Sequence, residues 1–166
     1  MSLEFQIPAE PEIKLFPGKK LMGLRRSMTF TENKTSELWK AFMPRRNEIK
    51  NSIGSELYSI QSYPISFFNP FNPMTPFEKW AAMEVSDFNW VPNGMETLIL
   101  PEGEYAVFIY KGDARNASPF FQYIFSKWIP ASGYQLGVRP HFEVLGEKYI
   151  HGDVDSEEEV WIPISI

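Results

Sequence analysis

The hydrophobic pattern of the chain occurs twice. Residues 12–26 (EIKLFPGKKLMGLRR) and 95–112 (METLILPEGEYAVFIYKG) share one layout: a short apolar run, a turn that contains Pro and Gly, and a longer apolar run ending in basic residues. Pro17 corresponds to Pro101 at an offset of 84 residues, which places Phe16 on Leu100. In each copy the turn residues predict a tight reversal, flanked by two β-prone runs that pair as strands.

A helical pattern follows each of these units. In the first copy Ser36 is a candidate N-cap, and three apolar residues then keep helical spacing: Leu38, Trp39 and Phe42. Pro44 is expected to bend or end this helix.

The second helix has a clearer pattern. Ser118 is its candidate N-cap, and Pro119 occupies the first turn, where the missing N–H costs nothing. The apolar stripe has the spacing i, i+3, i+4, i+7 and consists of Phe121, Ile124, Phe125 and Trp128. The segment 130–133, Pro-Ala-Ser-Gly, is expected to end the helix.

Two further strands are predicted after each helix. They fall in residues 55–68 and 79–86 in the first copy, and in residues 141–149 and 159–166 in the second. Ser86 and Ser165 are 79 residues apart, close to the first offset. The order strand–helix–strand–strand therefore occurs twice, in approximately 12–90 and 95–166. It predicts one α+β domain over residues 1–166, with a mainly antiparallel sheet and one helix in each half.

Residues 67–77 (FFNPFNPMTPF) interrupt this order. Three prolines and four phenylalanines in eleven residues exclude a regular helix or a central strand. A solvated loop has no reason to carry four phenylalanines. This loop therefore either folds over the core as a satellite cluster or forms the wall of a cavity.

Composition limits the available chemistry. The chain has 166 residues, a net charge of −5, no cysteine and two histidines, and 16% of its residues are aromatic. The absence of cysteine excludes disulfides, cysteine-ligated metals and a cysteine nucleophile. The acidic balance argues against a nucleic-acid-binding surface, and no apolar run is long enough for a membrane helix. The N-terminus lacks the pattern of an export signal, so a cytoplasmic protein is expected.

Common catalytic and phosphate-binding motifs are also absent. The sequence contains no GxxxxGK[ST], GxGxxG or GxSxG pattern. Residues 151–155 (HGDVD) place three oxygen or nitrogen donors at alternate positions, but the acidic residues that follow favour a solvated hairpin loop over a metal site. No metal and no cofactor are therefore expected.

Glu143 lies within an apolar strand pattern, Pro140-His141-Phe142-Glu143-Val144-Leu145. One interpretation is an edge or solvent-facing residue. The other is a carboxylate inside an aromatic cavity, where it would either rise in pKa or bind a cation. Aromatic faces around such a site would add attraction for a cationic ligand. The residues alone leave both interpretations open.

Several segments together resemble the GyrI-like small-molecule-binding domains, which also occur as effector-binding domains of AraC- and MerR-type regulators. In the second half the similar segments are Leu100-Pro101 before the strand 105–108, 128–134 (WIPASGY) at the helix exit, Phe142-Glu143, and 160–164 (VWIPI). The first half is similar more loosely, through residues 14–17, 38–39 and 81–85. The resemblance extends over nearly the whole chain from about Glu12.

The resemblance implies two β-α-β-β units related by pseudo-twofold symmetry, with a ligand groove between the halves. Glu143 matches the glutamate that meets cationic, lipophilic effectors in this groove. The aromatic residues predicted to bind ligand with it are Phe68, Trp90, Tyr105, Tyr110 and Trp128. Phe121, Phe125 and Trp39 are expected to pack in the core.

The resemblance also implies the function. We expect a stand-alone sensor or sequestering protein that binds lipophilic, cationic or aromatic small molecules and does not itself bind DNA. One alternative is a hydrolase of strained electrophilic molecules with Glu143 as general base, and no catalytic residue is assigned otherwise. Another is a protein that binds DNA gyrase, and a transcription regulator is a further protein partner to consider.

Overall fold

The computed structural model describes residues 7–165; the first six residues and the last one of the predicted domain lie outside this range. The strands of the first half are β1 (Glu12–Phe16), β2 (Lys19–Met28), β3 (Leu57–Ser62) and β4 (Phe77–Glu84). Those of the second are β5 (Glu96–Leu100), β6 (Gly103–Lys111), β7 (Gln135–Leu136), β8 (His141–Leu145) and β9 (Glu157–Ser165). The protein is α+β, as predicted.

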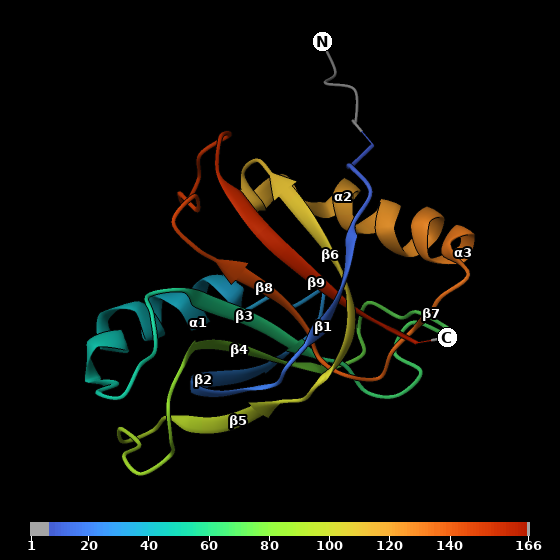
Figure 1. Ribbon diagram of the computed structural model, residues 1–166. Coiled ribbons are helices and arrows are strands. Elements are labelled where there is room, and N and C mark those ends of the chain that lie inside the picture. Colours follow the sequence, from blue (N-terminus) through green and yellow to red (C-terminus); the bar gives the residue numbers. More distant parts are fainter. Residues whose placement is uncertain (1–6, 166) are drawn as a thin grey trace.

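The sheet is antiparallel throughout its described pairings, in the order β1-β6-β9-β8-β3-β4-β2-β5, with the short β7 on β9. Figure 1 shows that it is strongly curled. The two central strands are β8 and β3, one from each half, and they join the halves.

The predicted tight reversals at Pro17 and Pro101 are wrong. β1 pairs with β6 and not with β2, while β2 pairs with β5. The chain bends at Pro17-Gly18, where Gly18 has a φ of 84°, and continues as a strand on the far side of the bend. Glycine adopts this conformation without steric cost. Two bent strands from the two halves therefore pair with each other, and neither half forms its own hairpin there.

The duplication is visible in the element boundaries. β1 and β5 each contain five residues and are offset by 84, as are the starts of β2 and β6 and the starts of β3 and β8. Ser59 pairs directly with Glu143 between β3 and β8, and these residues are also 84 apart. The pseudo-twofold axis therefore passes between Ser59 and Glu143.

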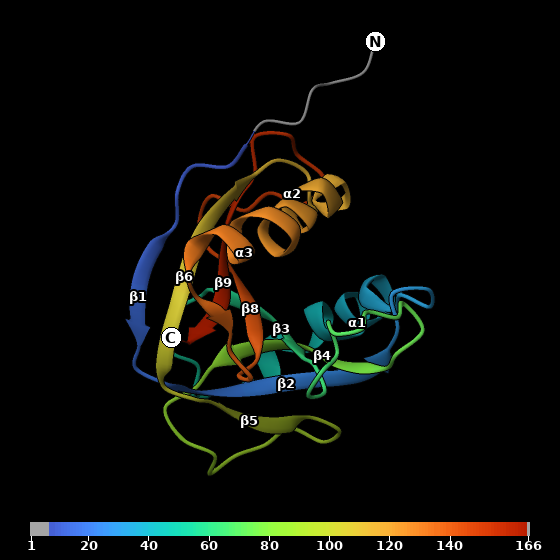
Figure 2. The same ribbon diagram turned by 90° about the vertical axis from the view of Figure 1, so that its right-hand side faces the viewer.

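Each half places helical structure on the same side of the sheet (Figure 2). In the first half α1 (Thr35–Phe42) continues as a 3₁₀ helix over Met43–Glu48, beginning next to Pro44. The residue at the N-cap is Lys34, two positions before the predicted Ser36, and its side chain makes no capping hydrogen bond. Just before it, the Asn33 Oδ1 accepts a hydrogen bond from the Thr35 N–H at 2.9 Å. Among residues 7–165 no helix has the length and apolar character needed to cross a membrane.

The helix of the second half changes its winding along its length. It consists of α2 (Ser118–Tyr123), a π-helical stretch over Ile124–Trp128 and α3 (Ile129–Ser132). Gly133, with a φ of 82°, follows its end, as the sequence predicts. The residue at the N-cap is Ala117, one position before the predicted Ser118.

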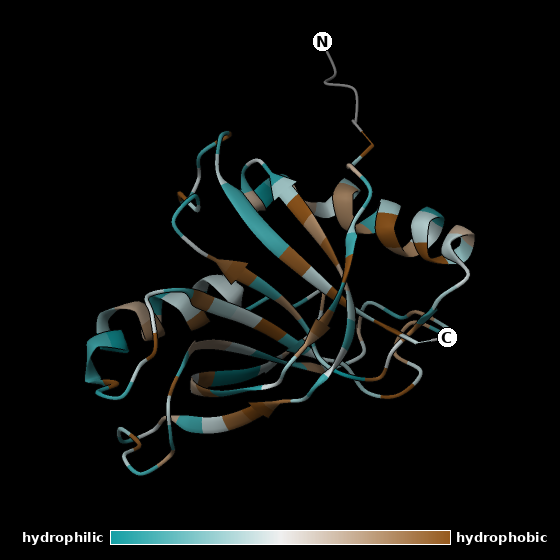
Figure 3. Cartoon of the chain, in the orientation of Figure 1, coloured by the Kyte–Doolittle hydropathy of each residue, from teal (hydrophilic) through white to brown (hydrophobic). Residues whose placement is uncertain are grey.

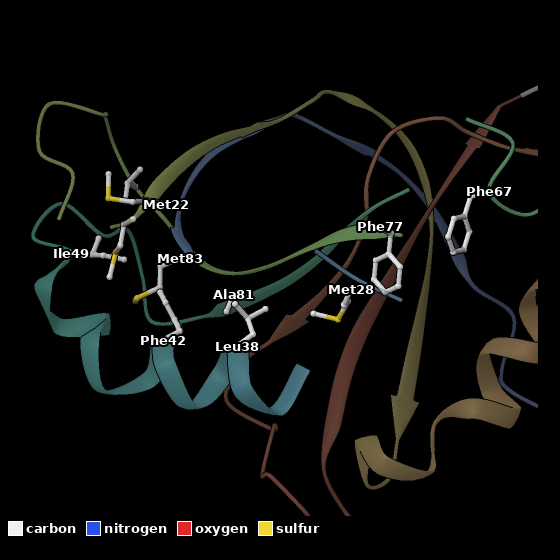
Figure 4. Packing of buried hydrophobic residues seen from close by; sticks show 11 residues of the cluster. Met22, Met28, Leu38, Phe42, Ile49, Phe67, Phe77, Ala81 and Met83 are labelled. Carbon is white, nitrogen blue, oxygen red and sulfur yellow. The ribbon is translucent and has the colours of Figure 1, made fainter. Parts of the chain in front are cut away.

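Hydrophobic residues within the described range 7–165 form three clusters. One lies between α1 and the first half of the sheet, where Leu38 and Phe42 pack on Met22, Ala81 and Met83 (Figure 4). A second lies between the helix of the second half and β6 and β9. The third fills the other face of the curled sheet and includes Phe16, Tyr58, Trp80, Leu100, Tyr105 and Phe142. Successive residues of a strand point to opposite faces of the sheet. Figure 3 shows hydrophobic stretches along the strands interrupted by hydrophilic ones.

A substitution at Gly23 tests how closely β2 approaches β4. A Cβ at this buried position would lie 1.9 Å from the carbonyl oxygen of Ala81 and 2.7 Å from the Cα of Ala82, both backbone atoms. Gly23→Ala is therefore expected to lower the free energy of unfolding by about 1–3 kcal/mol, as measured by urea denaturation. Gly146→Ala is the control, because the nearest atom to its Cβ would be 3.9 Å away. Equal stability of the two variants would contradict the predicted crowding.

Candidate functional site

Polar side chains gather on the helix-facing side of the central strands. We call six of them the central polar cluster: Ser59, Gln61, Lys79, His141, Glu143 and Glu158. On the same face, Ala81 of β4 belongs to the hydrophobic cluster under α1, and Val160 of β9 belongs to the cluster under α2. The central polar cluster thus lies between the two helix-covered clusters. Figure 2 shows α1 and α2 apart from each other, with β3 and β8 between them.

Strand register brings these residues to one face. Ser59 pairs with both Ala81 and Glu143, and Glu143 pairs in turn with Val160. Since alternate residues of a strand share a face, the residues two positions away on each strand point to the same side. Lys79 on β4 and Glu158 on β9 are those residues. Glu143 is therefore flanked by an ammonium group on one side and a second carboxyl group on the other.

Burial strongly perturbs the carboxyl groups of the cluster. Desolvation raises the pKa of Glu143 to about 7, although the Lys79 charge and a hydrogen bond from Gln61 act in the opposite direction. Desolvation also raises the pKa of Glu158 to about 8, and repulsion from Glu143 adds to this increase. Such shifts are typical of functional sites, because a fold that needs only stability avoids desolvated charges.

Lys79 provides the positive charge of the cluster. Desolvation lowers the pKa of its ammonium group, while attraction to Glu143 and Glu158 favours the charged form. His141, by contrast, is buried without a compensating anion, and desolvation lowers its pKa to about 3. The imidazole is therefore neutral near pH 7 and contributes an aromatic face rather than a charge.

The loop between β3 and β4, residues 63–76, borders the cluster at one end, and we call it the aromatic loop. Tyr63 lies close enough to Glu143 for the carboxylate to raise its phenol pKa, in addition to the larger effect of burial. The Tyr63 ring meets His141 edge-on with a centroid distance of 4.9 Å. Phe68 stacks on Phe125 of the second helix at 4.9 Å and on His141 at 5.7 Å. The loop thus connects the two halves above the sheet.

This loop fulfils both expectations for residues 67–77. Phe67 is buried and packs with Phe30 and Phe77 at ring-centroid distances of 5.8 Å, which makes a satellite cluster. The loop also lines a depression of about 220 Å³, together with the segment before β8. The lining includes Tyr63, Phe67, Phe68, Leu136, Arg139 and His141. It reaches His141, two residues along β8 from Glu143.

The structure places Phe68 against His141 at one end of the cluster and Tyr110 opposite Glu158 at the other end. It places Tyr105, Trp128 and Trp90 elsewhere. Tyr105 is fully buried on the opposite face of the sheet, where its hydroxyl donates to the carbonyl oxygen of Pro140 at 2.9 Å. Burial raises its pKa to about 12. Both faces of β6 are apolar, so the sequence does not show which face Tyr105 occupies. The strand register places it on the side opposite the helices.

Tyr110 and Trp128 lie in the core under the second helix. The Tyr110 hydroxyl donates to the carbonyl oxygen of Asp113 at 2.7 Å, and the Trp128 indole donates to the Glu10 carboxylate at 3.1 Å. The Trp128 ring also meets Phe108 edge-on at 5.2 Å. Tyr110 nevertheless lies near Glu158, whose charge contributes to its raised pKa, after the larger effect of burial.

Trp90 lies in the loop between β4 and β5 and is 57% exposed. That loop is held to the 3₁₀ helix of the first half, since Arg45 donates to the carbonyl oxygen of Asn93 at 2.5 Å. Trp90 is therefore outside the central polar cluster.

Sequence reasoning missed Lys79, Gln61, Ser59, Glu158 and His141 as members of the site. The internal repeat contains a signal that could have found two of them. At the offset of 79 residues between Ser86 and Ser165, Lys79 corresponds to Glu158. Charged residues at equivalent positions, each two residues before an apolar position of its strand, indicate a shared polar face.

A curled antiparallel sheet with one helical segment in each half and a carboxylate near the pseudo-twofold axis defines the class of duplicated effector-binding domains. The model of the GyrI-like small-molecule-binding domain matches residues 9–165. The chain belongs to this family.

Comparison with known proteins gives a similar result. The transcriptional regulator BrlR of Pseudomonas aeruginosa is 29% identical over 150 residues, which are 89% of this chain and 53% of the regulator. The chain thus spans about half the length of this curated relative. The C-terminal domain of EcmrR superposes with a TM-score of 0.68 at 17% identity, covering 94% of this chain and 97% of that domain.

Two further solved structures share the fold. SAV2435, bound to tetraphenylphosphonium, has a TM-score of 0.67 at 12% identity, covering 95% of this chain and 94% of that one. A hydrolase from Listeria innocua has a TM-score of 0.59 at 11% identity, covering 95% and 93%. At these identities the likeness establishes the fold alone, which occurs in proteins of different function.

The raised carboxyl pKa values predict a specific pH dependence of stability. Between the unfolded and folded pKa values of Glu143 and Glu158 the folded state binds more protons, so stability falls as pH rises. Neutral His141 acts in the opposite direction, but only below its ordinary pKa of 6.5. From pH 6.5 to about 8 the free energy of unfolding is therefore expected to fall, by at most about 1.4 kcal/mol per pH unit for each carboxyl group.

Urea denaturation across this pH range measures the effect. The double variant Glu143→Gln/Glu158→Gln is expected to lose the fall, and each single variant to lose part of it. Glu147→Gln, at an exposed position on the same segment, is expected to keep it. A double variant with the same pH slope as the wild type would contradict the assignment.

Proposed function

We propose that this protein binds lipophilic cations at the central polar cluster, as a sensor or sequestering protein, with Glu143 as the anionic contact. The single observation that carries the proposal is the desolvated carboxyl group of Glu143 at the pseudo-twofold axis. A desolvated carboxylate attracts a cation more strongly than an exposed one does, because less water screens the charge.

The energetics favour a lipophilic ligand over a small hydrated ion. A hydrated ion would have to shed its water to reach Glu143, and Lys79 already supplies a compact positive charge there. A large cation with apolar substituents gains apolar burial and contact with aromatic faces as well as charge compensation. The rings of Tyr63, Phe68 and Phe125, grouped around His141, supply such faces.

The depression of about 220 Å³ beside Phe68 provides an approach to the cluster. Its wall is formed by the loop after β3, which includes Tyr63, by residues 136–139 and by His141. A ligand that enters there meets aromatic rings first and the carboxylate of Glu143 further along β8. Membership of the family supports small-molecule binding, and tetraphenylphosphonium, which is bound to SAV2435, is a suitable probe.

Titration calorimetry with tetraphenylphosphonium tests the proposal. The wild type is expected to show saturable binding whose affinity increases with pH through the range in which Glu143 ionises, because the probe has a fixed charge. Glu143→Gln keeps the shape of the side chain and removes the charge. It is expected to weaken binding by at least about tenfold near pH 8.

The exposed Glu147→Gln removes the same charge from the protein outside the cluster and is expected to bind as the wild type does. Equal affinity of Glu143→Gln and the wild type would exclude Glu143 as the anionic contact. The absence of saturable binding to the wild type would exclude the proposed function itself.

The aromatic wall can be tested separately. Phe68→Ala removes a half-buried ring that stacks on Phe125 and His141, and is expected to weaken tetraphenylphosphonium binding by about three- to tenfold. Trp90→Ala removes a larger but exposed ring outside the cluster and is expected to leave the affinity within about twofold. A stronger effect at Trp90 than at Phe68 would place the ligand elsewhere on the protein.

One structural observation also favours the hydrolase alternative. A carboxyl group with a pKa of about 7 is suited to general-base catalysis at neutral pH. Incubation with an electrophilic cyclopropane compound, followed by mass spectrometry, distinguishes the alternatives. Binding without chemistry leaves the compound intact, whereas a product heavier by one water, formed by the wild type but not by Glu143→Gln, would establish hydrolysis.

A further inference from the structure

The pseudo-twofold axis relates two residues of opposite charge. Lys79 precedes Ala81 by two positions on β4, and Glu158 precedes Val160 by two positions on β9. Ala81 pairs with Ser59 and Val160 pairs with Glu143, while Ser59 and Glu143 pair with each other. Lys79 and Glu158 are therefore equivalent positions of the two halves, on opposite sides of Glu143.

The charge of the central polar cluster follows from this arrangement. Ionised Glu143 and Glu158 contribute two negative charges, and Lys79 compensates one of them. The other groups facing the cluster are neutral at pH 7 in their ordinary forms or are held neutral by burial: Tyr63 after β3, His141 on β8, Tyr110 on β6 and Tyr149 in the loop after β8. The fully ionised cluster thus has one uncompensated negative charge.

We propose that Lys79 is a specificity-determining residue that sets the charge of the ligand, so that the site accepts a lipophilic monocation and discriminates against a dication. The inference rests on the proposed function of the same site. A single positive charge completes the neutralisation of the two carboxylates. A second positive charge on the ligand would meet the Lys79 ammonium group instead of an anion.

Desolvation makes this discrimination effective. Electrostatic interactions between charges on the cluster are weakly screened, so that Lys79 interacts with both Glu143 and Glu158. The same reduced screening applies to repulsion between Lys79 and a bound cation. Specificity is a difference between affinities, and a repulsive element such as Lys79 contributes to it without any contact to the preferred ligand.

Lys79 and Glu158 also differ in how near they lie to the aromatic loop. It pairs with Gln61, which in turn pairs with His141, the residue that Tyr63 and Phe68 contact. Lys79 is thus nearer the end of the cluster where the depression opens. Glu158, its twofold mate, lies toward the opposite end, near Tyr110.

The experiment compares two probes on the same variants. Dissociation constants for tetraphenylphosphonium, a monocation, and benzyl viologen, a flat aromatic dication, are measured near pH 8, where the carboxyl groups ionise and favour the charged form of Lys79, whose pKa burial lowers. The ratio of the two constants is compared between variants, so that the constant effect of probe shape cancels. Lys79→Met, which keeps length and removes charge, is expected to shift this ratio toward the dication by at least about tenfold relative to the wild type.

Matched variants separate charge from packing. Lys79→Arg keeps the positive charge and is expected to leave the ratio within about twofold. Lys40→Met removes an exposed lysine of α1 and is expected to leave it unchanged. Lys79→Gln provides a second neutral side chain if Lys79→Met does not fold, and the expected shift is in the same direction.

The outcomes distinguish this inference from the function on which it rests. A wild type that binds tetraphenylphosphonium, together with neutral Lys79 variants that keep the wild-type ratio, would overturn the role of Lys79 alone. An equal shift in Lys79→Arg would also overturn it, because the shift would then follow from packing. A wild type that binds neither probe would overturn the proposed function and this inference together.

Discussion

The pairing of two bent strands, one from each half of the chain, is the constraint on which the rest of the structure depends. The segment containing β1 and β2 runs alongside the segment containing β5 and β6, and both segments bend at a proline-containing turn. Because β1 and β5 are the ends of the sheet while β2 and β6 lie within it, the sheet has to curl. The inside of the curl is filled by the large aromatic residues around Phe16, Tyr105 and Phe142.

The curl also determines where a polar site can exist. The helices need apolar surface, and they find it on β2 and β4 in one half and on β6 and β9 in the other. Apart from Leu57 at the start of β3, which packs against the cluster under α1, the helix-facing side of the central strands β3 and β8 belongs to neither cluster. Polar side chains on that stretch, Gln61 and Glu143 among them, are enclosed by their neighbours without being packed under a helix. The site therefore follows from the way a duplicated unit covers a continuous sheet.

The repeat was predictable because its turn residues, helical stripes and terminal strands keep one order and nearly one offset. The partner of each strand was not, because a proline–glycine sequence is equally compatible with a hairpin and with a bend between two strands. The face of Tyr105 was not predictable for a related reason: both sides of β6 are buried, so its sequence shows no polar alternation. Glu143 could be singled out as a candidate because the family resemblance supplied a position that periodicity could not. The role of Lys79 depends on register between four strands, which local sequence does not encode.

The two halves of the chain provide an internal test of whether the charges serve stability. Ser59 occupies the position equivalent to Glu143, so the fold accepts a small neutral residue at the axis. Lys79 and Glu158 occupy equivalent positions with opposite charges, so neither charge is required by the backbone there. Desolvated charges reduce stability unless they are compensated, and when Glu143 and Glu158 are both ionised the compensation is incomplete by one positive charge. The duplicated fold thus carries an electrostatic asymmetry that costs stability in the free protein when both carboxyl groups are ionised, and the cation proposed as the ligand would remove that cost.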